Sequence, residues 1–405
     1  MTQPTNNNSL TLPQVIFNPE FLEFHRILDE HERAHWVPDE ADLRIDIEQW
    51  HNGFLSEREK AFIKNILRLF TQADTDVCAA YVNRLLPIFR HPDARCMLLS
   101  FASREVTHMK GYRRLNETLG FDDLGFMSEF LEFKEMKDKH EFMIEEMPLD
   151  TPANIALYLA KQVLMEGVNL FGSFVMLLSF SQKGAAPGTV SVNRWSIVDE
   201  SHHVDGLTAL FKQYLAQHPE VVNNHFKAAI YEFARKVTQL EEAFIRLCYQ
   251  AGDNPCLTAD QAIDYVKMTC DYRMQQLGLK AQFGIKTNPA PWMDLITKNT
   301  LANFFETTVV EYSKNAMAGE WKYPELNEDA LPAHYRKAKN LTSPSVFFDK
   351  SVIPSEGNPL VIKGSQVHDA LQSILVSTNT LKESTSGYAF KGSLGGLGSI
   401  SWANR

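Results

Sequence analysis

The chain has 405 residues, 44% of them hydrophobic, and a formal net charge of −10. This is the composition of an ordinary globular protein, and the length allows one large domain or two. With a pI near 5.7 the chain lacks the basic surface that nucleic acids and anionic membranes require, so we expect neither as the main partner.

The N-terminal segment, MTQPTNNNSLTLPQ, is polar and has neither the basic nor the apolar part of a signal peptide. The five cysteines are widely spaced and form no CxxC pair, which favours reduced, mostly buried thiols over a disulfide framework or a zinc site. These features predict a cytoplasmic protein. We interpret residues 1–55 as an N-terminal arm with one helix over about 19–34.

Residues 56–321 are dominated by long helical patterns and predict an all-α bundle. Capping boxes at Ser56 with Glu59 and at Thr258 with Gln261 mark two helix starts. The predicted helices cover 56–90, 93–119, 125–145, 152–182, 189–217, 222–251 and 259–278.

The longest uncharged run, 167–182, is 16 residues long and carries Asn and Ser, so it is shorter than a membrane span. We expect it to be a buried helix. After residue 321 Pro, Ser and Thr become frequent, and we place a boundary near 322, with 322–405 a C-terminal extension of unknown structure.

The predicted helix over 93–119 carries Glu105, His108 and Tyr112 on its apolar stripe, because these residues follow the apolar ones at steps of three and four. A second Glu-x-x-His pair, Glu200 and His203, lies on the inward stripe of the helix predicted over 189–217. The neighbouring residue His202 is turned roughly 100° away and is the weaker candidate.

Two further acids interrupt apolar helix faces. Glu166 is the only charged residue between Gln162 and Gln182, where an uncompensated carboxylate would cost several kcal/mol. Asp74 lies on the apolar stripe of the predicted helix 56–90, whereas Asp76 is turned about 200° from it.

Each feature alone has an ordinary explanation. A single Glu-x-x-His pair rarely binds metal, a buried Glu commonly pairs with a Lys, and an Asp can cap locally. Lys161, however, is on another face of its helix than Glu166. Together the acids and histidines predict a dinuclear metal site on four helices, and this carboxylate and imidazole set suits iron or manganese better than zinc. The predicted ligands are Asp74, Glu105, His108, Glu166, Glu200 and His203.

The order Asp…Glu-x-x-His-x-x-x-Tyr…Glu…Asp-Glu-x-x-His resembles the radical-generating small subunit of class I ribonucleotide reductase, a ferritin-like family. The resemblance covers about residues 20–321 and extends to the strings FTQADTDV, YEFARKV, QLGLKAQFG and NFFETTVVEYSK. It implies a ferritin-like long-helix bundle with a buried dinuclear centre of two iron ions, with manganese–iron or dimanganese centres as alternatives.

The resemblance also implies an activity and its residues. The family uses O₂ at the metal centre to oxidise a buried tyrosine, here Tyr112, to a stable radical. It passes the oxidising equivalent through an aspartate and a tryptophan, here Asp199 and Trp36, to a large catalytic subunit. A homodimer that joins this large subunit is the expected assembly. Without the resemblance, Tyr112 would be a plain core tyrosine and Trp36 an anchor for the N-terminal arm.

The chain departs from the family at its end. Family members usually finish in a short tail with one docking tyrosine, whereas this chain offers Tyr323, Tyr335 and Tyr388 and nothing selects among them. Two alternative functions remain open at this point: a di-iron oxidase or oxygenase that acts directly on a small substrate, and a non-catalytic iron-storage bundle.

Overall fold

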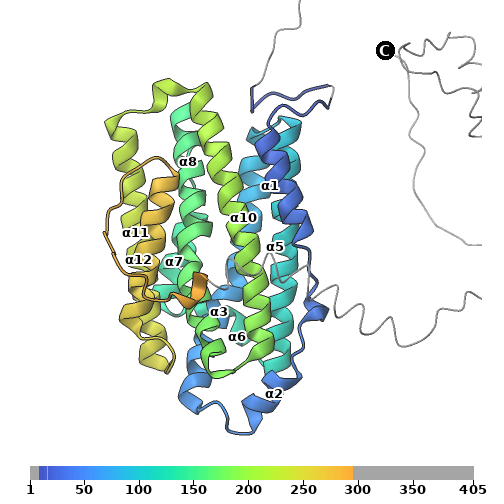
Figure 1. Cartoon of the computed structure of the whole chain (residues 1–405), viewed down its shortest axis with the longest axis vertical. Helices are drawn as coiled ribbons and strands as arrows, with labels where there is room; N and C mark the ends of the chain where they lie inside the picture. Colours follow the sequence, from blue (N-terminus) through green and yellow to red (C-terminus); the bar gives the residue numbers. More distant parts are fainter. Residues whose placement is uncertain (1–8, 16, 295–405) are drawn as a thin grey trace, which may run out of the picture. The chain divides into compact units, whose positions relative to one another are not determined.

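The computed structural model of the chain describes residues 9–15 and 17–294, and all regular structure in this part is helical. The long helices run side by side along the molecule, and a shorter one, α2 (Arg44–His51), lies at one end of the bundle (Figure 1). The predicted boundary near 322, the candidate tail tyrosines and the string NFFETTVVEYSK lie outside the described residues.

The predicted all-α architecture is confirmed. The remaining longer helices are α1 (Leu22–Arg33), α3 (Glu57–Ala80), α5 (Pro92–Leu119), α7 (Lys134–Ile144), α8 (Pro152–Leu164), α9 (Phe171–Leu178), α10 (Pro187–Gln217), α11 (Asn224–Ala251) and α12 (Ala259–Gln276). Short pieces complete the described part: α4 (Leu86–Ile88), α6 (Leu124–Ser128), four 3₁₀ turns at 38–40, 129–131, 179–183 and 219–221, and two π-helical segments, Tyr81–Leu85 and Met165–Asn169.

Local sequence signals explain where several helices begin and end. The Ser56 hydroxyl accepts a hydrogen bond from the Glu59 backbone N–H at 3.2 Å, and the Glu59 carboxylate accepts one from the Ser56 N–H at 2.9 Å. Thr258 and Gln261 form the same reciprocal pair at the start of α12. Helix α5 ends at Gly120, whose φ of 79° is the left-handed value that glycine adopts most readily.

Three predicted helices are not continuous. The ones expected over 56–90 and 152–182 each contain a π-helical segment. The one expected over 125–145 is divided into α6, a 3₁₀ turn and α7. At this break the Arg68 guanidinium lies over two aromatic rings, that of Phe126 in α6 and that of Phe133 just before α7. The two helical pieces therefore pack on a buried cation that comes from α3.

The apolar segment Pro152–Lys183 is long and hydrophobic enough to cross a membrane, yet its apolar window is entirely buried inside the bundle. It occupies the place of a core helix, in agreement with the buried helix predicted there. The N-terminal helix α1 packs against α5 and α10, so the predicted N-terminal arm contributes this helix directly to the bundle.

All five cysteines are free. Cys248 and Cys270 are buried, Cys78 and Cys256 are half-buried, and Cys96 is exposed. The thiols are therefore unpaired as predicted, although fewer are fully buried than expected.

Candidate dinuclear metal centre

The structure brings together the six residues predicted as ligands. One possible ligand atom from each of Asp74, Glu105, His108 and Glu200 lies within 4.8 Å of the others, and the same holds for Glu105, Glu166, Glu200 and His203. We call these two groups the first and the second metal position. All six side chains are at most 1% exposed, so the cluster is closed inside the bundle.

The first metal position is built from three helices. Asp74 comes from α3, Glu105 and His108 come from successive turns of α5, and Glu200 comes from α10. The second metal position takes His203 from the next turn of α10 and Glu166 from the π-helical segment after α8. Because residues three apart share a helix face, each Glu-x-x-His pair projects both of its side chains toward the same point.

Glu105 and Glu200 each span both metal positions. The Glu105 carboxylate places Oε2 3.3 Å from His108 Nδ1 and Oε1 3.0 Å from His203 Nδ1. The two oxygens of Glu200 lie 3.3 Å and 3.5 Å from the same two nitrogens. Glu105 and Glu200 could therefore hold both metal ions, whereas Asp74 belongs only to the first position and Glu166 only to the second.

The polar atoms at the centre fit a pair of cations. Within the described part of the chain, these buried atoms make no hydrogen bond: both carboxylate oxygens of Glu105, one oxygen each of Asp74 and Glu200, and Nδ1 of both His108 and His203. Four buried carboxylates face only two imidazoles here, and buried negative charge that is not compensated costs several kcal/mol. Two bound cations would satisfy all of these atoms at once, and the oxygen and imidazole donors suit Fe(II) and Mn(II).

The electrostatics of the cluster agree with this fit. Burial raises the pKa of Asp74 well above its usual value, and although His108 opposes the rise, the neighbouring Glu105 adds to it. Burial likewise raises the pKa of Glu166 to about 7. Carboxyls that are difficult to ionise on their own become good ligands when a cation replaces the proton.

The neighbouring charges do not neutralise the cluster. Lys161 pairs with Glu145 at 3.1 Å and lies under the ring of Phe142, so it does not compensate Glu166. Asp76 turns away from the centre and binds His140 Nδ1 at 2.6 Å. His202 is in neither group of potential ligands.

Tyr112 lies one turn beyond His108 on α5 and is fully buried. Its ring packs on Phe70 with a centroid distance of 4.6 Å, and Phe70 in turn packs on Phe174. The hydroxyl donates a hydrogen bond to Asn193 Oδ1 at 3.2 Å. Burial raises the pKa of Tyr112 well above its usual value and the charge of Asp74 raises it further, so the phenol stays protonated at neutral pH.

Trp36, Asp199 and His108 form a continuous hydrogen-bonded chain. The indole N–H of Trp36 donates to Asp199 Oδ2 at 2.7 Å, and His108 Nε2 lies 3.1 Å from the same oxygen. The Trp36 ring also stacks on the His108 ring at 5.9 Å. At Gly111 a Cβ atom would stand 3.1 Å from the indole, so glycine at this position leaves room for Trp36 against α5.

Comparison with known families agrees with this geometry. The family model described as ribonucleotide reductase, small chain, matches residues 13–289. A probable ribonucleoside-diphosphate reductase small subunit of invertebrate iridescent virus 3 is 36% identical over 317 residues, covering 73% of this chain and 83% of the relative. The chain belongs to the ribonucleotide reductase small-chain family. The subunit beta of Chlamydia pneumoniae ribonucleoside-diphosphate reductase is 29% identical over 293 residues. This match covers 68% of this chain and 83% of the relative.

Several solved structures share the fold of this chain. The ribonucleotide reductase R2 subunit from Clostridium botulinum aligns with this small chain at a TM-score of 0.61 and 16% identity, covering 71% of this chain and 99% of the other. The Rnr4 homodimer of Saccharomyces cerevisiae gives 0.60 at 19% identity, with coverage of 75% and 92%. The dimanganese(II)-NrdF of Streptococcus sanguinis gives 0.55 at 15%, with coverage of 69% and 96%. At these identities the structures show the fold alone.

Two residues of the small chain that touch the cluster were not identified from the sequence. The Tyr81 hydroxyl donates to Glu166 Oε2 at 2.6 Å, and His31 Nε2 lies 3.2 Å from His203 Nε2. A signal for His31 was present, because it follows Phe24 and Ile27 on the buried stripe of α1. Tyr81 follows directly after α3 and continues the apolar stripe on which Asp74 lies, but a tyrosine on an apolar stripe is indistinguishable from ordinary core packing.

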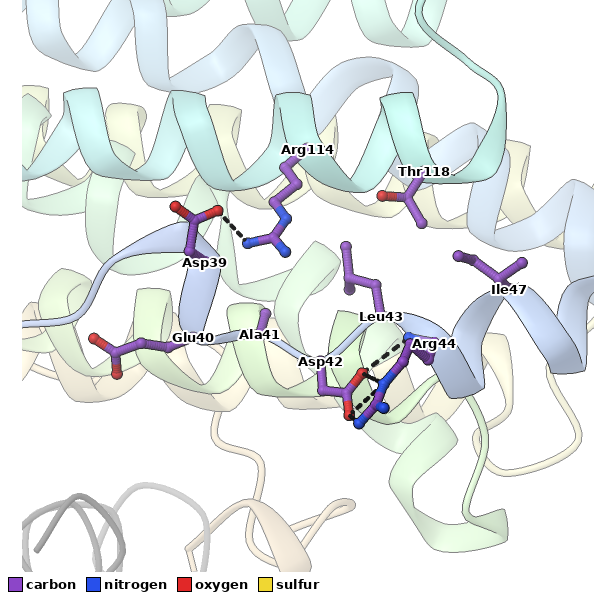
Figure 2. Close-up of a pocket in the computed structure, with 9 residues that line it drawn as sticks. All are labelled: Asp39, Glu40, Ala41, Asp42, Leu43, Arg44, Ile47, Arg114 and Thr118. Carbon is purple, nitrogen blue, oxygen red and sulfur yellow. Dashed lines mark hydrogen bonds and ion pairs between the residues drawn. The ribbon is translucent and has the colours of Figure 1, made fainter. Parts of the chain in front are cut away.

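A separate pocket of about 510 Å³ is lined mainly by residues 39–44, which follow Trp36 in the chain. Figure 2 shows two ion pairs in its lining, in which neither partner is Glu40: Arg114 of α5 reaches Asp39, and Arg44 folds onto Asp42. These groups are satisfied by one another, so the pocket is distinct from the closed metal cluster in both position and chemistry.

Proposed function

We propose that this chain is the radical-generating small subunit of a ribonucleoside-diphosphate reductase and that its cluster holds two iron ions. The observation that carries the proposal is the chain Trp36–Asp199–His108, which joins the first metal position to an indole on the N-terminal segment. A direct oxidase would need no such connection. Membership of the small-chain family supports the same function.

Two metal ions held by the six predicted ligands would supply, with O₂, a one-electron oxidant. The chain's own residues then decide what is oxidised. Tyr112 is beside the first metal position, and its phenol would give up one electron and one proton. Phe70 covers the ring and excludes water, and Asn193 holds the hydroxyl in place. Exclusion of water and of other reductants is what would give the radical a long life.

Asp199 has two roles in this proposal. It accepts a hydrogen bond from the indole of Trp36 and orients His108 through Nε2, which leaves Nδ1 of that histidine free to face the metal position. The same carboxylate can accept the indole proton when Trp36 gives up an electron.

The assembly that we propose is a homodimer that joins a separate large catalytic subunit in the cytoplasm. The Rnr4 relative is a homodimer, and the curated relatives are named as small subunits. Iron is our first assignment for the metals. Manganese–iron and dimanganese centres use the same kinds of ligand, and the Streptococcus sanguinis neighbour is a dimanganese protein.

The deciding experiment is electron paramagnetic resonance at low temperature on the metal-free full chain after addition of Fe(II) and O₂. We expect a tyrosyl radical, and ribonucleotide reduction once the cognate large subunit is added. Parallel samples loaded with Mn(II), alone or with Fe(II), test the other metals through their own signals. Consumption of O₂ without a radical or reductase activity in every sample would instead favour the oxidase alternative.

We expect Trp36→Phe to separate radical formation from radical use. The six predicted ligands and Tyr112 are unchanged in this variant, so it should bind metal and form the radical, but reductase activity with the large subunit should fall to background. Trp50→Phe, which also shortens a partly buried indole but lies away from Asp199, is the matched control. Normal reductase activity in Trp36→Phe would remove Trp36 from the route.

A further inference from the structure

The second metal position has supporting residues of its own. We propose that Tyr81 and His31 are positioning residues that hold Glu166 and His203 in the geometry needed to bind the second metal ion. This inference rests on the proposed dinuclear function and adds to it a means by which the two positions differ in affinity.

Tyr81 acts on Glu166. The tyrosine is fully buried at the start of the first π-helical segment, and its hydroxyl hydrogen bond to Glu166 Oε2 is short, at 2.6 Å. Glu166 itself comes from the other π-helical segment, Met165–Asn169, which contains no Lys or Arg. A hydrogen bond to one carboxylate oxygen limits rotation of the carboxylate and directs its remaining lone pairs toward the cluster.

The π-helical segment that carries Glu166 is also held from outside. Lys139 of α7 donates to the carbonyl oxygen of Asn169 at 2.8 Å, and Arg273 of α12 donates to that of Gly167 at 3.3 Å. Such segments occur frequently at functional sites because they displace one side chain from the regular helical register. With the backbone held by these two side chains, Tyr81 orients the Glu166 carboxylate through Oε2, the oxygen that also lies 3.2 Å from His203 Nδ1.

His31 acts on His203 through the hydrogen-bond pattern of the two rings. His203 Nδ1 faces Glu105 and Glu166, so as a metal ligand it carries no proton and Nε2 must carry one. His203 Nε2 then donates to His31 Nε2 at 3.2 Å. That arrangement requires the proton of His31 on Nδ1, which lies 2.9 Å from the Ser100 hydroxyl and can donate to it.

The first metal position depends on different partners. His108 is oriented by Asp199, whereas the ligands to which Tyr81 and His31 hydrogen-bond, Glu166 and His203, belong to the second position. His31 Nε2 is 3.9 Å from Asp199 Oδ1, beyond hydrogen-bonding distance. Loss of either positioning residue should therefore weaken one metal ion rather than both.

Mn(II) binding to the metal-free full chain tests this inference without any catalytic readout. Free Mn(II) is counted by electron paramagnetic resonance during a titration, and we expect the unaltered chain to bind two equivalents. Tyr81→Phe keeps the buried ring and should bind the first ion normally and the second roughly tenfold to a hundredfold more weakly. Tyr214→Phe, which removes a buried hydroxyl remote from the cluster, should change neither ion.

Substitutions at His31 add a rescue test. His31→Gln retains an acceptor for His203 and should bind the second ion almost normally, whereas His31→Leu should weaken it as Tyr81→Phe does.

Adding Tyr81→Phe to Glu166→Ala should cause no further loss, because Tyr81 acts through Glu166. Circular dichroism confirms folding of each variant.

The outcomes are distinguishable. If the unaltered chain binds no pair of ions, the proposed dinuclear function fails. If it binds two, and Tyr81→Phe leaves both affinities unchanged or lowers both equally, the dinuclear function stands and the positioning role of Tyr81 is wrong. Equal loss of affinity for the second ion in His31→Gln and His31→Leu would overturn the role of His31 as a hydrogen-bond acceptor for His203.

Discussion

Tyr112→Phe should abolish the stored radical and the reductase activity while leaving the fold and the metal centre in place. Only a hydroxyl is removed, and the partners it loses are the side chains of Asn193 and Ser196. The phenol is not among the six predicted ligands. O₂ should still be consumed, because the metal pair is intact, but no tyrosyl signal should persist in the paramagnetic resonance spectrum.

Tyr265→Phe is a suitable control for this prediction, since it also removes the hydroxyl of a buried tyrosine but lies on α12 outside the cluster. It should retain both radical and activity. Near-normal ribonucleotide reduction by Tyr112→Phe would mean that the oxidising equivalent resides on the metals or on another residue.

Removal of a carboxylate that belongs to both metal positions should weaken metal binding more than removal of one that belongs to a single position. Glu105 faces both His108 and His203, so Glu105→Ala should weaken both ions by more than roughly 100-fold. Glu166 belongs to the second position only, so Glu166→Ala should spare the first ion. Equilibrium dialysis with Fe(II) under anaerobic conditions, or with Mn(II), measures both affinities.

Asp74→Ala completes this comparison, because Asp74 belongs to the first position only. It should lose the ion that Glu166→Ala retains. Two full equivalents at unchanged affinity in Glu105→Ala would contradict the assignment of Glu105 to both metal positions, and two in Glu166→Ala would remove Glu166 from the site.

Helix periodicity predicted most of the metal cluster. Glu105 with His108, and Glu200 with His203, are three residues apart, so a regular helix projects each pair from one face whatever surrounds it. The same reasoning separated Asp74 from Asp76 on α3. The structure places Asp74 in the cluster and pairs Asp76 with His140.

The interruptions of the long helices could not be predicted from residue spacing within one helix. The helices predicted over 56–90 and 152–182 contain π-helical segments, and the one over 125–145 is broken. The extra residue of a π-helical turn is stabilised by groups from other helices. In the segment that carries Glu166 these are Lys139 and Arg273, which come from α7 and α12.

The sequence by itself determined the helical class, the apolar stripes and the polar residues that interrupt them, because these depend on spacing within one helix. Only the tertiary structure decided which oxygen of Glu105 faces which histidine, and that Tyr81 and His31 support the second metal position. Hydrogen bonds between residues 85 and 172 positions apart in the chain, such as Tyr81 to Glu166 and His31 to His203, exist only after the helices have packed. Their geometry is set by the relative placement of whole helices, about which the periodicity of any single helix carries no information.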